Sequence, residues 1–156
     1  VYMTEKVAKK VGEAYAFAQV LSETFKNNSE VMSELLGEHA ENIEDITRVQ
    51  MEELKDIAEE SDMDEVVLPK SERTAEKITK MGDMYVGDDW DDAAEVLEWM
   101  SFFVGGAIVH WQLITGSAEK MDNDHFQNVT GVGTEYYEAL MKQLKVSATK
   151  IGEERA

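Results

Sequence analysis

Apolar residues recur at intervals of three and four along most of the chain, which is the spacing of one face of a helix. Stretches that alternate between apolar and polar residues, as half-buried strands do, are too short to predict a sheet. The pattern therefore predicts a protein made of helices. The long helices are expected over residues 4–26, 30–60, 90–121 and 125–151, and a shorter one over residues 72–85.

The breaks in this pattern set the expected helix ends. Asn27-Asn28-Ser29 separates the first two helices and offers a side chain to cap the second. Residues 61–71 are interpreted as a linker because they contain Pro69, the only proline, and Ser71 can cap the short helix. Asp88 or Asp89 can cap the next helix, and residues 122–124 predict a tight reversal.

These elements predict an all-α fold. The specific expectation is a four-helix bundle with an additional short helix in the connection between helices two and three. A chain of 156 residues fits one domain, and we expect a single domain over residues 1–156.

Residues 99–118 carry no Asp, Glu, Lys or Arg, although the chain has a formal net charge of −18. Wound as a helix, this run presents apolar residues on three faces and a narrow seam of polar or small residues on the fourth. Its length reaches the lower working limit for a membrane span, about 20 residues. Gly, Ser, Gln and His dilute it, however, and aspartates flank it. We therefore expect a buried helix of a soluble protein.

A helix with three apolar faces needs more covering than an ordinary bundle provides, since such helices expose about half of their circumference. Exposed apolar patches of this size mark association sites, so we expect a homodimer formed through the helix at residues 90–121. Two adjacent glycines would let a neighbouring backbone approach closely. The candidate residues for a dimer interface or a ligand pocket are Trp99, Met100, Phe102, Phe103, Gly105, Gly106 and Trp111.

Charge and composition limit the classes of binding partner that we expect for this chain. With 33 Asp and Glu against 15 Lys and Arg, the chain repels phosphate backbones and anionic membrane surfaces, so we expect no nucleic-acid partner and no membrane. An acidic surface could attract a basic protein. There is no cysteine, which excludes disulfides and thiolate chemistry. The start of the chain lacks the apolar region of a secretory signal, so a cytoplasmic protein is expected.

Helix pairs joined by a long connection resemble the ferritin-like architecture, and the resemblance rests on helix order over most of the chain. It implies a carboxylate on one helix of each pair and a Glu-x-x-His motif on the other, facing inward to hold two metal ions. This sequence departs from that pattern, because Leu36 stands three residues before His39 and Ala107 stands three residues before His110. Asp122-x-x-His125 has the spacing but falls in the predicted turn.

A different metal site remains open. His39 and His110 lie on apolar stripes and would be level if helices two and three were antiparallel, with Glu13 and Glu135 within about two turns of that layer. Imidazole and carboxylate ligands suit Fe or Zn. If helices two and three were parallel, the two imidazoles would be about 15 Å apart in height. The alternative is that each histidine bonds to a neighbour in the core.

The sequence shows no phosphate-binding loop, dinucleotide fingerprint or nucleophile–base motif. The leading hypothesis is a non-enzymatic acidic bundle that self-associates through residues 90–121 as an interaction or small-ligand-binding module. The alternative is a ferritin-like metal-binding or redox protein that uses His39, His110 and nearby carboxylates. A third hypothesis is a pocket for a small apolar ligand, lined by Trp99, Met100, Phe103 and Tyr15.

Overall fold

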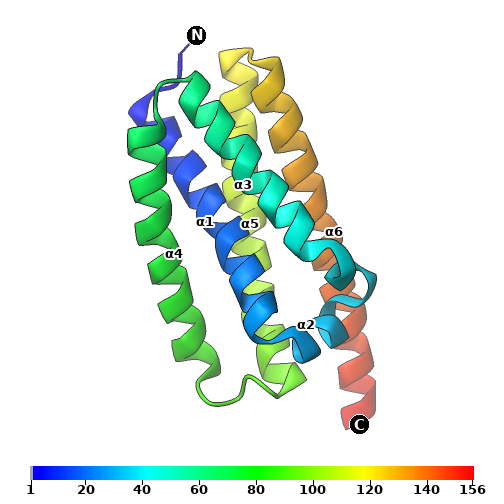
Figure 1. The fold of residues 1–156 in the computed structure, drawn as a ribbon. Helices are drawn as coiled ribbons and strands as arrows, with labels where there is room; N and C mark the ends of the chain where they lie inside the picture. The colour runs from blue at the N-terminus through cyan, green and yellow to red at the C-terminus, as the bar shows by residue number, and fades with distance from the viewer. Residues whose placement is uncertain (1) are drawn as a thin grey trace.

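The computed structural model describes residues 2–156, and helices account for nearly all of them (Figure 1). No strand occurs in this range, so the all-α expectation is confirmed. Five helices are long, and a short helix and a 3₁₀ segment join the first two of these. In chain order the elements are α1 (Glu5–Asn27), α2 (Ser29–Leu36), η1 (Gly37–Asn42), α3 (Ile43–Glu60), α4 (Asp64–Val86), α5 (Ala93–Met121) and α6 (Asp124–Arg155).

The long helices run alternately down and up the bundle in Figure 1, starting with α1 downward and ending with α6 downward. Helix α1 occupies the middle and packs against α3, α4 and α5, whereas α6 packs mainly against α5. Small residues make this central position possible, because Ala8, Ala14, Ala16 and Ala18 are fully buried and let the neighbouring backbones approach α1 closely. Within residues 2–156, no helix is both long and apolar enough to cross a membrane.

The expected helix over residues 30–60 is interrupted. Gly37 ends α2 with φ of +56° and ψ of −129°, a conformation that glycine adopts far more easily than other residues. The 3₁₀ segment η1 follows before α3 begins. Periodicity did not reveal this break because the apolar spacing continues across it. The chain changes direction here, so α2 lies across the lower end of the bundle and α3 rises along it (Figure 1).

The expected linker over residues 61–71 is wrong for most of its length, and the expected short helix is a full-length one. Helix α4 begins at Asp64 and includes Pro69. The backbone nitrogen of Pro69 has no hydrogen, so it cannot donate the usual helical hydrogen bond to the carbonyl of Glu65. Pro69 is exposed, so water can reach this part of the helix. Ser71 caps nothing; its hydroxyl donates to the carbonyl of Leu68 at 2.6 Å within the helix. Residues 2–156 therefore form a bundle with five long helices rather than four.

The remaining helix ends follow the sequence closely. Asp122, with φ of +54°, ends α5 in the left-handed conformation, and Asn123 caps α6 by accepting from the backbone of Phe126 at 3.0 Å. The expected reversal at residues 122–124 is thus confirmed. Helix α5 begins slightly later than expected, because Asp92 rather than Asp88 or Asp89 accepts from its first free N–H groups.

Candidate functional site

The charge-free helix α5 keeps one apolar stripe in contact with solvent. Phe102, Val109 and Leu113 are 61%, 59% and 49% exposed, although each is a large apolar residue. Phe102, Gly106, Val109 and Leu113 follow one another at intervals of four, three and four residues. This spacing is typical of the contact stripe between two paired helices. The tertiary structure therefore leaves uncovered one of the three apolar faces of this helix.

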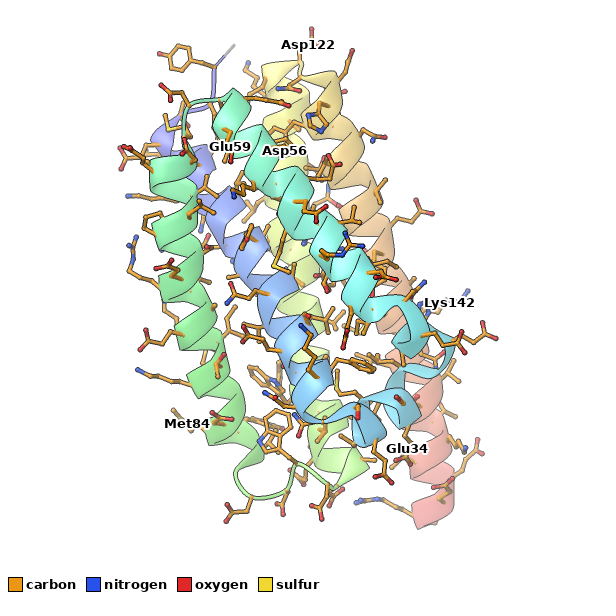
Figure 2. All side chains as sticks on the ribbon, in the orientation of Figure 1. Glu34, Asp56, Glu59, Met84, Asp122 and Lys142 are labelled. Carbon is orange, nitrogen blue, oxygen red and sulfur yellow. The ribbon has the colours of Figure 1, made fainter. Side chains whose placement is uncertain are left out.

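Helix α4 extends this surface at the lower end of the bundle. Met81, Met84 and Tyr85 are 50%, 82% and 42% exposed, and Figure 2 shows Met84 projecting from the lower part of α4. The ring of Tyr85 meets that of Phe102 edge to face, with centroids 5.3 Å apart. The two helices thus form one surface, which we call the apolar face and define as Met81, Met84, Tyr85, Phe102, Val109 and Leu113.

A groove lies between α4 and α5, with α1 as its floor. Its lower part is a hollow of about 280 Å³ with largely apolar walls that include Phe17, Trp99 and Phe103. Its upper part, a hollow of about 390 Å³, shares Glu13 with the lower one and is bordered by Leu113 and four lysines. These are Lys6, Lys9, Lys10 and Lys70, a concentration of positive charge in an otherwise acidic chain.

Glu13 and His110 meet inside this groove. The side chain of Glu13 is only 15% exposed, and its Oε2 atom lies 2.9 Å from Lys10 Nζ and 3.9 Å from His110 Nε2. His110 Nδ1 donates to the carbonyl of Gly106 at 2.7 Å, because a carbonyl oxygen only accepts. In the neutral ring this leaves Nε2 unprotonated and facing the carboxylate. The structure therefore brings together two of the four metal-ligand candidates.

The other two candidates lie elsewhere. His39 is in η1 at the lower end of the bundle, and Glu135 is exposed on α6. Helices α3 and α5 run in the same direction, because the full-length α4 returns the chain to the lower end before α5 begins (Figure 1). The two histidines are therefore not level. In the part of the chain that the structure describes, no three His, Asp or Glu residues form a group suited to a metal ion.

Most of the aromatic candidates belong to the core of their own chain. Trp99, Met100, Phe103 and Trp111 are at most 5% exposed, and among these Trp99 and Phe103 reach the wall of the groove. Gly105 and Gly106 are partly exposed, and a Cβ atom at Gly106 would lie 3.2 Å from the ring of Phe17. The sequence-based candidates for an interface did not include Val109, Leu113 or the three α4 residues. Val109 and Leu113 could have been found from the sequence, because they lie seven and eleven residues after Phe102 on the same face of the helix.

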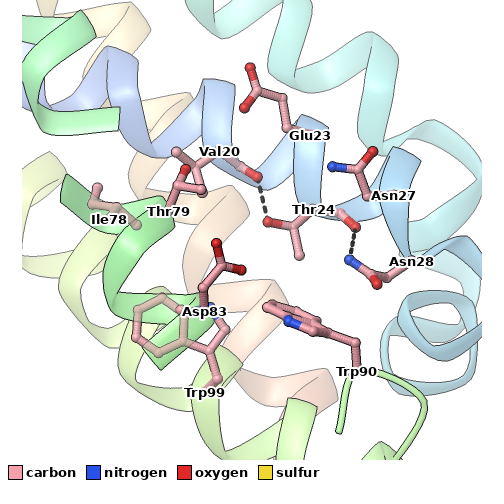
Figure 3. Close-up of a pocket in the computed structure, with 11 residues that line it drawn as sticks. Val20, Glu23, Thr24, Asn27, Asn28, Ile78, Thr79, Asp83, Trp90 and Trp99 are labelled. Carbon is pink, nitrogen blue, oxygen red and sulfur yellow. Dashed lines mark hydrogen bonds between the residues drawn. The ribbon is translucent and has the colours of Figure 1, made fainter. Parts of the chain in front are cut away.

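A third hollow, of about 250 Å³, lies near the lower ends of α1 and α4 beside two tryptophans, Trp90 and Trp99 (Figure 3). Two of its polar residues bond to the backbone at the end of α1 (Figure 3). The hydroxyl of Thr24 donates to the carbonyl of Val20 at 2.7 Å, and the amide of Asn28 donates to the carbonyl of Thr24 at 3.1 Å. These bonds satisfy backbone carbonyls at the end of α1.

A histidine bridge ties α6 to α3 at the upper end. His125 Nε2 lies 2.7 Å from a carboxylate oxygen of Glu53, and its Nδ1 lies 3.1 Å from one of Glu60. Hydrogen bonds to both carboxylates, Glu53 first, raise the pKa of His125 above its ordinary value. The charged imidazolium can donate to both partners at once, so this bridge favours protonation.

Compared with known proteins, the chain matches no protein-family model, no curated protein and no solved structure. The ferritin-like resemblance therefore has no support from a known family or fold, and the description that stands is an all-helical bundle.

Proposed function

We propose that this protein is an interaction module that forms a homodimer through its apolar face. The observation that carries the proposal is the exposed stripe of Phe102, Val109 and Leu113 on a helix that has no charged residue between positions 99 and 118. Interface cores are depleted of charge and enriched in aromatic residues and methionine. On a surface of this kind, two chains of charge −18 can meet without like charges at the centre of the contact.

The distribution of charge around the apolar face favours a second copy, packed with its α5 antiparallel to the first. The lysine cluster of α1 and α4 borders the upper end of the face. The loop at the lower end, just before α5, carries Asp88, Asp89, Asp91 and Asp92. A two-fold axis near the middle of α5 places the aspartates of each copy close to the lysines of the other. Opposite charges at the rim of an interface favour this orientation.

The size of the apolar face suits a reversible dimer. Its six side chains are between 42% and 82% exposed, and complete burial of one such side chain contributes about 1.5–3 kcal/mol. Covering what remains exposed therefore contributes about 5–10 kcal/mol per copy. Association itself costs about 4–15 kcal/mol in lost freedom of motion. Counted over both copies, burial contributes about 10–20 kcal/mol. A micromolar dissociation constant corresponds to a net of about 8 kcal/mol, which lies within the difference between these two ranges, so the dimer should form at micromolar concentrations and dissociate on dilution.

Light scattering coupled to size-exclusion chromatography tests this proposal, with the chain loaded over a range of micromolar concentrations. We expect wild-type protein to have the mass of a dimer and Val109→Glu to have the mass of a monomer. Val146→Glu is the matched control, because Val146 is 60% exposed and lies on α6, outside the apolar face. A helical circular-dichroism spectrum shows that each variant is folded.

The same experiment contains the outcomes that contradict the proposal. Wild-type protein that remains monomeric at tens of micromolar, in both low and high salt, would refute the homodimer. Equal masses for Val109→Glu and Val146→Glu would place any self-association outside the apolar face. High salt should weaken the dimer only partly, since it screens the rim charges and leaves apolar burial in place.

A further inference from the structure

A separate pocket lies between α3 and α6, away from the apolar face. Its volume is about 380 Å³, which is within the range of small-molecule sites. Two of its wall residues, Val49 and Val132, are 46% and 61% exposed, so the pocket opens to solvent past apolar side chains. The lining also includes Asp45, Ile46, Gln50, Glu53 and Tyr136.

Two hydrogen-bond donors in this lining have no acceptor. Gln50 is only 6% exposed, and its Oε1 atom accepts from the hydroxyl of Tyr137 at 2.9 Å. Its Nε2 atom and the hydroxyl of Tyr136 are buried and find no partner among residues 2–156. Burial raises the pKa of Tyr136, which keeps its hydroxyl protonated and able to donate. Buried donors without partners are rare and unfavourable, so this pair points to an acceptor supplied from outside the chain.

The charged residues of the lining limit which acceptor fits the pocket. Asp45 and Glu53 are among the lining residues, whereas no lysine or arginine of residues 2–156 is. The two carboxylates already face cationic groups, since Asp45 lies 3.5 Å from Arg48 and Glu53 lies 2.7 Å from His125. An anionic ligand would be repelled by the two carboxylates, and no cationic side chain of the lining would offset this repulsion. A cationic ligand would have to compete with Arg48 and His125 for the same carboxylates. An uncharged ligand meets neither the repulsion nor the competition.

We propose that this pocket binds a small, uncharged, largely apolar molecule that carries a carbonyl group. The valines and Ile46 bury its apolar body, and the carbonyl oxygen accepts from Gln50 Nε2 and the hydroxyl of Tyr136. Both donors lie behind the surface that water touches, so the carbonyl enters by a rotation of the side chains that cover them. This site is independent of the homodimer, because it uses α3 and α6 rather than α4 and α5.

The probe for this test is Nile red, an uncharged dye with one carbonyl whose emission rises in apolar surroundings. Because the apolar face could also take up such a dye, every titration is made in the Val109→Glu background. Val132→Glu places a charge in the pocket mouth and should weaken binding at least tenfold. Val146→Glu introduces the same charge on the same helix at a residue with nearly equal exposure, and binding should be unchanged.

A second variant tests the hydrogen bond itself. Tyr136→Phe should weaken Nile red binding about two- to tenfold, the usual effect of losing one hydrogen bond. Binding of diphenylhexatriene, a hydrocarbon probe with no carbonyl, should not weaken.

Three results would overturn the proposal. They are no saturable binding of Nile red, equal binding by the Val132→Glu and Val146→Glu variants, or an equal loss of both probes on Tyr136→Phe. Light scattering of the wild-type chain reports the dimer separately, so failure of one proposal is distinguishable from failure of the other.

Discussion

Gly133 gives the sharpest test of how α5 and α6 pack. A Cβ atom at this position would lie 2.3 Å from two ring carbons of Trp111, well inside any contact that real Cβ atoms make. Trp111 is fully buried and cannot move into solvent. Gly131, two residues earlier on the same helix, is exposed, and a Cβ atom there would meet nothing within 4 Å. Alanine at these two positions therefore separates a steric clash from helix propensity.

The magnitudes follow from two opposing effects. Replacing a helical glycine by alanine stabilises a helix by about 1 kcal/mol, and Gly131→Ala should show that gain alone. Overpacking a core costs about 1–3 kcal/mol, and a distance of 2.3 Å puts Gly133→Ala at the upper end of this range. After the propensity gain, Gly133→Ala should lower the free energy of unfolding by about 2 kcal/mol. The two variants should then differ by about 3 kcal/mol.

Urea unfolding followed by circular dichroism measures this difference. With a slope of about 2 kcal/mol per molar urea, the midpoint should rise by about 0.5 M in Gly131→Ala and fall by about 1 M in Gly133→Ala. Near-ultraviolet circular dichroism should change in the second variant alone, because the environment of Trp111 changes. If Gly133→Ala is as stable as Gly131→Ala, Trp111 does not cover Gly133, and the packing described for α5 and α6 is wrong.

Two further predictions concern α4 and the histidine bridge. Pro69→Ala restores a backbone donor within α4 and should raise the free energy of unfolding by about 1–3 kcal/mol in the same urea assay; if residues 61–71 were a linker, the loss of proline would lower stability or leave it unchanged. The folded-state pKa of His125 is raised, so the bridge stabilises the fold fully below about pH 6.5, the unfolded-state pKa, and this contribution is lost as pH rises through the folded-state pKa. The stability difference between wild type and His125→Gln should therefore be larger at pH 6 than at pH 9, by at most about 1 kcal/mol because 37% of the side chain is exposed; a difference that does not change with pH would contradict the bridge.

Some features of the site were visible in the sequence and others were not. The absence of charge between residues 99 and 118 and the spacing of Phe102, Val109 and Leu113 are properties of one segment. They predicted an unusually apolar helix with a face available for association. Counting residues along helices placed Glu13 and Glu135 near a layer shared by His39 and His110, but this count assumed that helices two and three are antiparallel, whereas α3 and α5 run in the same direction (Figure 1). Gln50 and Tyr137 are 87 residues apart and bond at 2.9 Å, and nothing in either local pattern indicates the other.

The sequence by itself determined that the chain is helical, where α6 begins, and that α5 is apolar nearly all round, because helix periodicity and capping depend on residues a few positions apart. The tertiary structure alone decided that residues 64–71 join α4, that Gly37 interrupts the second helix, and which apolar stripe of α5 stays uncovered. Each of these depends on contacts between distant segments. Packing against α1 stabilises a helix through Pro69 that local preference disfavours, and the positions of α1, α4 and α6 leave Phe102, Val109 and Leu113 facing solvent.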